Sequence, residues 1–214
     1  MNEHDTTGAT RAEALLACLR GRRSVRNFRQ EPVPREVLEK VLEAAIWAPS
    51  ATNLQPWRFV VLQGARKGEL VELLRRFVAG LQPGLNPVLW VHRAGLARCA
   101  AIIEGAPVAI TAWAMVTPED RRLRLVARGD RTPLFSWSMV VQSVAAAVEN
   151  LLLAAHALGL GAVWLGYPNL AAPEIASWLH EEGELMATVA LGYPAEEPST
   201  RRRRPLREVV RWEG

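Results

Sequence analysis

The stretch from Leu134 to Leu158 reads LFSWSMVVQSVAAAVENLLLAAHAL and contains neither glycine nor proline. It is apolar on almost every side, a pattern typical of a helix that other elements cover. Gly159 and Gly161 follow directly, and glycine commonly ends a helix. The sequence therefore predicts a long buried central helix, with the rest of the chain arranged around it.

Shorter segments of both kinds surround this helix. Strands are expected over residues 57–62, 106–116, 162–165 and 184–191, and further helices over residues 10–21, 34–48, 65–79, 93–104 and 173–180. Residues 1–9 are an expected flexible arm, and residues 10–214, including a C-terminal extension over 195–214, are expected to form a single domain. Because no repeat and no clean boundary divides the chain, the predicted fold class is α+β.

The net charge of +4 is concentrated at one end of the chain. Residues 199–214 hold six arginines and two acidic residues, so the other 198 residues sum to zero. A neutral body excludes a generally basic nucleic-acid-binding surface. Nucleic-acid binding through the arginine tail alone stays open as a minor alternative.

The cysteines and apolar runs indicate the compartment. Cys18 and Cys99 belong to no CxxC pair and are expected to be buried thiols in a reducing, cytoplasmic setting. The polar N-terminus predicts no signal peptide. The longest mainly apolar run, residues 151–166, is shorter than the ~20 residues of a membrane span, so no membrane association is expected.

Common catalytic motifs are absent from the sequence. It contains no GxSxG, no HExxH and no metal-spaced Cys/His cluster, and its four histidines are dispersed. The run Gly159-Leu-Gly161 resembles the start of GxGxxG, but Trp164 stands at the third glycine position. So sparse an inventory is typical of redox chemistry carried by a bound organic cofactor.

Three polar segments are candidates for binding such a cofactor. Residues 22–29, RRSVRNFR, offer guanidinium groups and a hydroxyl that suit a phosphate, although a solvated basic turn fits them too. Residues 48–57, APSATNLQPW, offer hydroxyls and amides for the edge of a planar polar ring, or form a capped surface turn. Residues 159–168, GLGAVWLGYP, contain glycines that permit close approach of the backbone to a ligand.

In combination, these motifs resemble the nitroreductase family of flavin enzymes over about residues 11–211. The resemblance rests on the order and spacing of RRSVRNF at 22–28, APSATNLQPWRFVV at 48–61, NLLLAAHALGLGAVWLGYP at 150–168, ALGYP at 190–194 and RRRRPLREVV at 201–210. It implies an α+β nitroreductase-like fold with a central, mainly antiparallel sheet flanked by helices. It also implies a homodimer with flavin sites at the interface and a C-terminal tail that extends over the partner.

The resemblance further implies bound FMN, NADH or NADPH as hydride donor, and a small-molecule electron acceptor such as a nitroaromatic or a quinone, reduced in a ping-pong reaction. The cofactor carries the chemistry, so no side chain is expected to be catalytic. The implied cofactor-binding residues are Arg22, Arg23, Ser24 and Arg26 at the phosphate, Pro49, Ser50, Ala51, Asn53 and Gln55 from the partner subunit, Leu165 and Gly166 at the reactive nitrogen, and Arg201 and Arg203 closing on the phosphate. Four consecutive arginines leave the register of the last two uncertain by a residue or two.

The chain also departs from the family pattern. Leu165 stands where many bacterial members carry an acidic residue, and residues 80–92 and 117–133 would form the substrate lid. The alternatives are a non-catalytic flavin- or deazaflavin-binding module, or another flavin chemistry on this fold such as dehalogenation, ene reduction or dehydrogenation.

Overall fold

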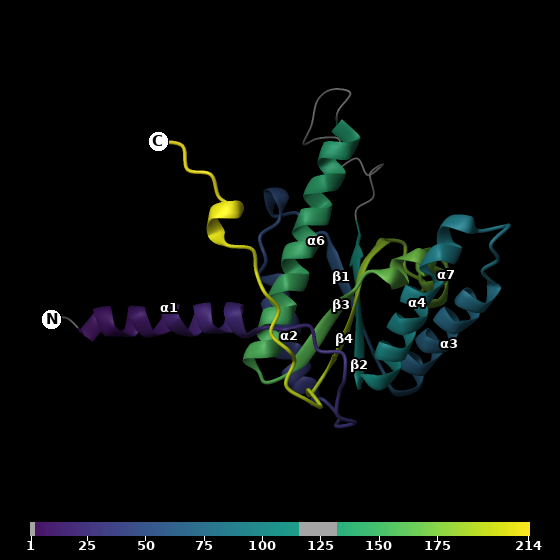
Figure 1. Ribbon diagram of the computed structural model, residues 1–214, viewed down its shortest axis with the longest axis horizontal. Coiled ribbons are helices and arrows are strands. Elements are labelled where there is room, and N and C mark those ends of the chain that lie inside the picture. Colours follow the sequence, from purple (N-terminus) through teal and green to yellow (C-terminus); the bar gives the residue numbers. More distant parts are fainter. Residues whose placement is uncertain (1–2, 116–131) are drawn as a thin grey trace.

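The computed structural model describes residues 3–115 and 132–214, which form an antiparallel sheet with helices on both faces (Figure 1). The strands β1 (Trp57–Gln63), β2 (Val108–Ala114), β3 (Gly161–Leu165) and β4 (Glu184–Gly192) lie in the order β1-β2-β4-β3. Every neighbouring pair is antiparallel, with Val108 opposite Leu191 in the central pair. The mainly antiparallel sheet expected from the sequence is confirmed.

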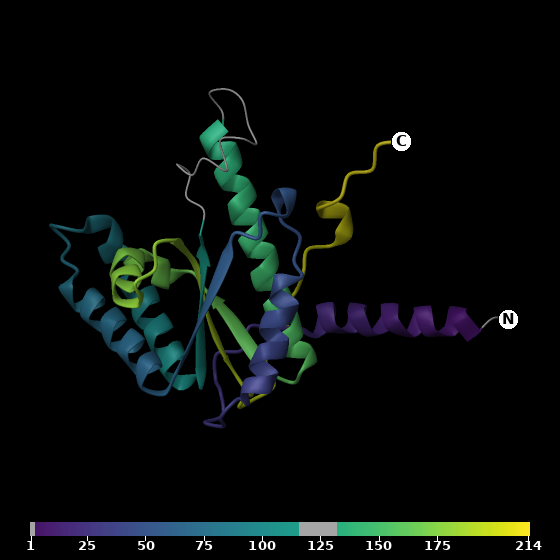
Figure 2. The same ribbon diagram turned by 180° about the vertical axis from the view of Figure 1, so that it is seen from behind.

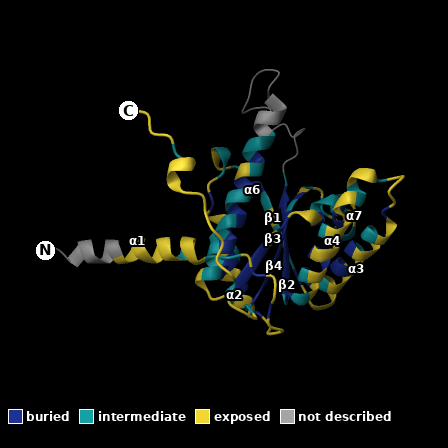
Figure 3. Ribbon diagram, in the orientation of Figure 1, coloured by how far each residue is buried: buried dark blue, intermediate teal, exposed yellow. Residues whose placement is uncertain are grey.

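Two groups of helices sandwich the sheet (Figures 1 and 2). One face is covered by α2 (Arg35–Ile46) and α6 (Thr132–Ala157), and the other by α3 (Gly64–Gly80), α4 (Pro87–Gly105) and α7 (Ala172–Leu179). Successive residues of β2 point to opposite faces, so Ile110 packs with the α6 side and Ala109 with the α4 side. The result is two apolar cores separated by the sheet, whose central strands β2 and β4 are largely buried (dark blue in Figure 3).

The long central helix is confirmed as α6. Residues 137–157 are long and apolar enough to span a membrane by length and composition. Val140, Val144, Val148 and Leu151, however, lie buried in the core between this helix and the sheet. The spacing of these residues follows one helical face, so the apolar character of α6 is explained by its place in the fold.

Two helices begin earlier than the sequence suggests. Helix α1 spans Glu3–Gly21, so most of the arm expected over residues 1–9 is helical, because extending a formed helix costs little per residue. It projects away from the sheet and helices (Figure 1), and the Cys18 thiol near its C-terminal end donates to the Leu153 carbonyl at 3.6 Å.

Helix α4 starts at Pro87 rather than Arg93, because proline is well suited to the first helical turn. The first part of the expected lid, residues 80–92, is therefore helical from Pro87 onward, while nearly all of the second part, residues 117–133, lies outside the described residues.

Shorter 3₁₀ helices complete the described structure. They are η1 (Ala51–Asn53), η2 (Tyr167–Ala171) and η3 (Leu206–Glu208). The last belongs to the tail, which passes beside α6 and ends away from the sheet (Figures 1 and 2).

Lys67 of α3 caps the C-terminal end of α4. Its Nζ donates to the carbonyl oxygens of Ile103, Glu104 and Ala106 at 3.2, 2.7 and 2.6 Å, and partial burial lowers the pKa of its ammonium. We expect Lys67→Met to lower the free energy of unfolding by about 2 kcal/mol, because carbonyls at a helix end lose a charged donor. Urea denaturation would measure this, with Lys40→Met, an exposed lysine of α2, as a control expected to change little. Equal effects of the two substitutions would contradict the capping role.

Candidate functional site

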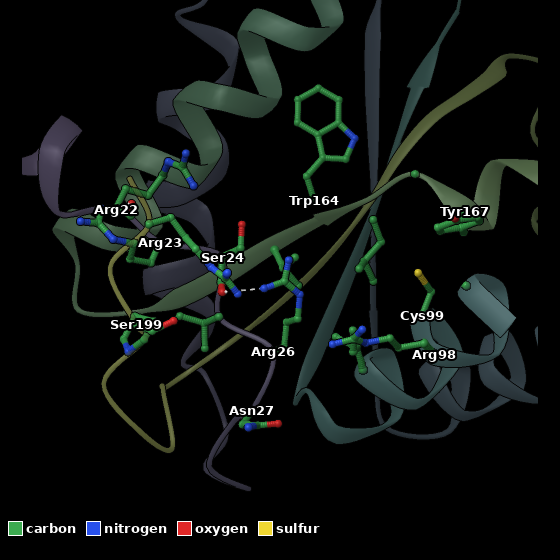
Figure 4. Close-up of a pocket in the computed structure, with 18 of the residues that line it drawn as sticks. Arg22, Arg23, Ser24, Arg26, Asn27, Arg98, Cys99, Trp164, Tyr167 and Ser199 are labelled. Carbon is green, nitrogen blue, oxygen red and sulfur yellow. Dashed lines mark hydrogen bonds between the residues drawn. The ribbon is translucent and has the colours of Figure 1, made fainter. Parts of the chain in front are cut away.

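A cavity of about 1000 Å³ lies where the segment after α1 and the first part of the C-terminal tail meet β3 and α4 (Figure 4). The N-terminal segment contributes Arg22, Arg23, Ser24 and Arg26, the tail contributes Ser199, Arg201 and Arg203, the end of β3 contributes Leu165 and Gly166, and α4 contributes Gly95, Arg98 and Cys99. The structure thus brings together eight of the thirteen residues proposed from the sequence. The two basic stretches, nearly 180 residues apart in sequence, line a single cavity.

The segment after α1 is fixed along the edge of the sheet. The Val25 N–H donates to the Ala162 carbonyl at 3.1 Å, and Ser24 forms a parallel bridge with Ala162. A Cβ at Gly161 would lie 2.7 Å from the Val25 side chain, so this close approach requires glycine. Strand β3 therefore holds the arginine segment at the wall of the cavity.

The basic end of the cavity has unsatisfied donors. The Nε atoms of Arg22 and Arg23 are buried and, within the described residues, make no hydrogen bond. The Arg22 Nε lies 3.3 Å from Glu149 Oε1, an ion pair without hydrogen-bond geometry. The anion-binding character of this end rests on the guanidinium groups that line it, those of Arg22, Arg23, Arg26, Arg201 and Arg203, because a guanidinium binds an anion with several oxygens well.

The end of β3 offers bare backbone to the cavity. A Cβ at Gly166 would meet no described atom within 4 Å, although Gly166 itself lines the cavity. The neighbouring Leu165 is buried. The missing side chain at Gly166 therefore leaves room for a flat group against the main chain.

The segment Pro49–Gln55 lies elsewhere. Its first three residues line a separate hollow of about 390 Å³ against α6, with Ser143 among the lining residues. The Gln55 N–H donates to Ser50 Oγ at 3.0 Å, and the Ala51 N–H donates to Ser143 Oγ at 3.3 Å. Within one chain, therefore, Pro49, Ser50, Ala51, Asn53 and Gln55 do not join the basic cavity.

This segment is also strained. Thr52, Asn53 and Gln55 have φ values of 51°, 56° and 48°, although none is glycine. Each residue in the left-handed region costs about 1 kcal/mol or more. Clustering of three such residues in one loop is typical of a binding or catalytic element rather than of a plain turn.

Several cavity residues were not singled out from the sequence. Arg98 lines the cavity from α4, and Figure 4 shows it facing the side where Arg26 lies. Cys99 is buried as expected but also borders the cavity, and burial raises the pKa of its thiol. Gly95 and Ile102 complete a stripe at helical spacing. The available signal was weak: Arg98 stands in the mainly apolar half of α4 that runs from Gly95 to Ile103.

Comparisons with known proteins agree with this geometry. The model of the Nitroreductase family matches residues 19–193. The chain is 32% identical to an NADH dehydrogenase of Thermus thermophilus over 94% of this chain and 96% of that one, and 30% identical to a 5,6-dimethylbenzimidazole synthase of Rhodospirillum rubrum over 86% and 84%.

Solved structures share the architecture. A BluB-like flavoprotein from Clostridium difficile superposes with a TM-score of 0.73 at 27% identity, covering 94% of this chain and 99% of that one. A Desulfovibrio desulfuricans protein described as a nitroreductase in complex with FMN gives a TM-score of 0.67 at 32% identity, covering 94% and 96%. With a family match over most of its length, a sheet of the same architecture and a cavity at the expected motifs, this chain belongs to the nitroreductase family.

Proposed function

We propose that this chain is an FMN-dependent oxidoreductase that takes a hydride from NADH or NADPH and reduces a nitroaromatic, a quinone or a similar electrophilic acceptor in a ping-pong reaction. The observation that carries the proposal is the convergence of Arg22, Arg23, Arg201 and Arg203 on one cavity that also contains the open backbone of Gly166. Relatives named as NADH dehydrogenases and nitroreductases support the same chemistry.

The residues present fit FMN. The guanidinium groups of Arg22 and Arg23 would bind phosphate oxygens, together with the Ser24 hydroxyl and the tail arginines. The bare main chain at Gly166 would lie against the edge of the flavin ring. The cavity is also within the size range of ligand sites, roughly 300–1,000 Å³.

When bound, FMN supplies the two-electron chemistry by accepting a hydride from the nicotinamide and delivering it to the acceptor. The task of this chain is to position the reactants: the arginines would hold the phosphate, and the Leu165–Gly166 main chain would orient the reactive edge. A quinone needs one further proton to become a hydroquinone, and solvent can provide it. No catalytic side chain is therefore assigned.

We further propose a homodimer in which the segment Pro49–Gln55 of one chain completes the cavity of the other and the tail crosses onto the partner. The strain at Thr52, Asn53 and Gln55 supports this role, since a functional loop has a reason to retain it. Trp47 beside this loop is 79% exposed in the single chain. Light scattering on the purified protein would test the dimer.

The first test concerns Arg22. We expect Arg22→Ala to weaken FMN binding by about 10- to 100-fold, the range for loss of one charge-assisted contact, without a change in circular dichroism. Arg20→Ala, an exposed arginine at the end of α1 that does not line the cavity, is the matched control. Fluorescence titration of FMN would measure both. Unchanged affinity in Arg22→Ala would remove it from the phosphate site, and a protein that never takes up FMN would refute the proposal as a whole.

A second candidate function is a different flavin chemistry on the same fold. The relatives described as a 5,6-dimethylbenzimidazole synthase and a BluB-like flavoprotein favour it. Incubation of the FMN-loaded protein with NADPH and oxygen, followed by mass spectrometry for 5,6-dimethylbenzimidazole, separates it from the reductase. A yellow protein that oxidises neither nucleotide with any acceptor would instead be a non-catalytic flavin module.

We place the protein in the cytoplasm without a membrane or nucleic-acid partner. Cys18 and Cys99 are both free thiols, which suits a reducing compartment. Arg201 and Arg203 face the cavity, so cofactor binding gives part of the basic tail a role that does not involve nucleic acid.

A further inference from the structure

The cavity has a second end that differs in chemistry from the arginine end. In Figure 4, Tyr167 and Cys99 lie on the side opposite Arg22 and Arg23, with the end of β3 between them. We propose that Tyr167, held in place by Gly95, is a specificity-determining residue that stacks against the aromatic ring of the electron acceptor. This inference rests on the proposed function and deepens it.

Gly95 allows Tyr167 to lie directly on helix α4. A Cβ at position 95 would lie 2.5, 2.6 and 2.7 Å from Cζ, Cε2 and Cε1 of the Tyr167 ring. The ring therefore covers the bare main chain of Gly95. Glycine inside a helix costs roughly 1 kcal/mol relative to alanine, and contact with an aromatic ring is a physical reason to keep it.

The ring is fixed but still accessible. The centroids of the Tyr167 and His92 rings are 5.8 Å apart with a tilt of 50°, within the range of favourable aromatic pairs. Tyr167 is nevertheless 42% exposed, and both Tyr167 and Gly95 line the cavity. The part of the ring that neither Gly95 nor His92 covers is therefore available to a ligand in the cavity.

The position of Tyr167 relates it to the redox centre. It follows Gly166 directly in sequence, and Gly166 is the proposed contact of the reactive flavin edge. An acceptor must come close to that edge in order to receive a hydride. An electron-rich phenol ring there favours a flat, electron-poor ring such as a nitroarene or a quinone.

Tyr167→Leu in the FMN-loaded protein tests the stacking role. With nitrobenzene as acceptor, we expect KM to rise about tenfold. Ferricyanide has no ring to stack, and its kinetics should change less than twofold. Tyr193→Leu changes the other tyrosine, which packs against Arg29 outside this cavity, and should alter the two acceptors equally. Parallel loss of nitrobenzene and ferricyanide activity in Tyr167→Leu, or no loss at all, would overturn the proposal.

Gly95→Ala tests the support beneath the ring. The added methyl group must displace Tyr167, so KM for nitrobenzene should rise while ferricyanide turnover is retained. Gly68→Ala in α3, where a Cβ would meet nothing within 4 Å, is the matched control and should raise thermal stability without affecting KM. In the double variant Gly95→Ala/Tyr167→Leu the two effects should not add, because both act through the same ring. Additive effects would mean that Gly95 does not position Tyr167.

Ligand-observed NMR provides a measurement that does not depend on turnover. The saturation transferred to the nitrobenzene protons should fall to less than half in Tyr167→Leu and stay unchanged in Tyr193→Leu. A loss of this signal supports the stacking role even if neither nucleotide reduces the protein. Persistence of the signal rejects it even if the reductase activity is present, so the two proposals can fail separately.

Discussion

Replacing Arg201 and Arg203 together by alanine is expected to weaken FMN binding about 100-fold while the fold stays intact. Both side chains line the basic end of the cavity but are exposed in the free chain. Each charge-assisted contact with a phosphate then contributes roughly a factor of ten in affinity. Because the two exposed side chains lie in the tail, outside both apolar cores, circular dichroism and thermal stability without FMN should change little.

The neighbouring arginines are a matched control. Arg202 and Arg204 do not line the cavity, and Arg204 pairs with Glu208 at 3.3 Å. The double variant Arg202→Ala/Arg204→Ala removes the same charge from the same tail and should leave FMN affinity within about twofold. Fluorescence titration at fixed ionic strength distinguishes the two pairs. If both weaken binding equally, the tail acts through its total charge, and the assigned register is wrong.

Trp113→Ala is expected to destabilise the fold more than any surface change. Trp113 is fully buried on β2, facing α3 and α4, and its Nε1 donates to Thr111 Oγ1 at 2.8 Å. Removal of a buried tryptophan leaves a large cavity and costs about 3–5 kcal/mol. It also leaves the Thr111 hydroxyl without this donor. The melting temperature should fall by roughly 10 °C.

Trp113→Phe separates the contribution of volume from that of the hydrogen bond. Phenylalanine keeps most of the apolar contact but cannot donate to Thr111, so about half of the loss or less is expected. Urea denaturation of both variants would measure the difference. A Trp113→Ala variant as stable as the wild-type protein would contradict the packing described for this face of the sheet.

Elements with a regular apolar pattern could be predicted from the sequence. Helix α6 followed from a run without glycine or proline, and β2 followed from the apolar, β-branched residues between Ala106 and Val116. In both cases local preference and burial favour the same structure. The first turns of α1 and α4 were missed because helix extension and an initial proline leave only weak signals in sequence.

The site was only partly accessible from the sequence. The arginine stretches could be proposed as one phosphate site because the motif order resembles a known family, while spacing alone could not bring residues 22 and 201 together. Arg98 and Gly95 were missed because the sequence does not tell which face of α4 is turned toward β3. The strain at Thr52, Asn53 and Gln55 was also hidden, since none of them is the glycine that usually marks positive φ.

The meeting of two distant chain segments at one cavity has a consequence for biosynthesis. While the protein is being translated, Arg22 to Arg26 emerge early and Arg203 emerges last among the residues that line the basic wall. A nascent chain can form much of its sheet before that wall is closed. On the proposed role of Arg201 and Arg203, a chain that ends before these residues is expected to hold FMN more weakly than the full chain, so cofactor retention would report whether synthesis reached the tail.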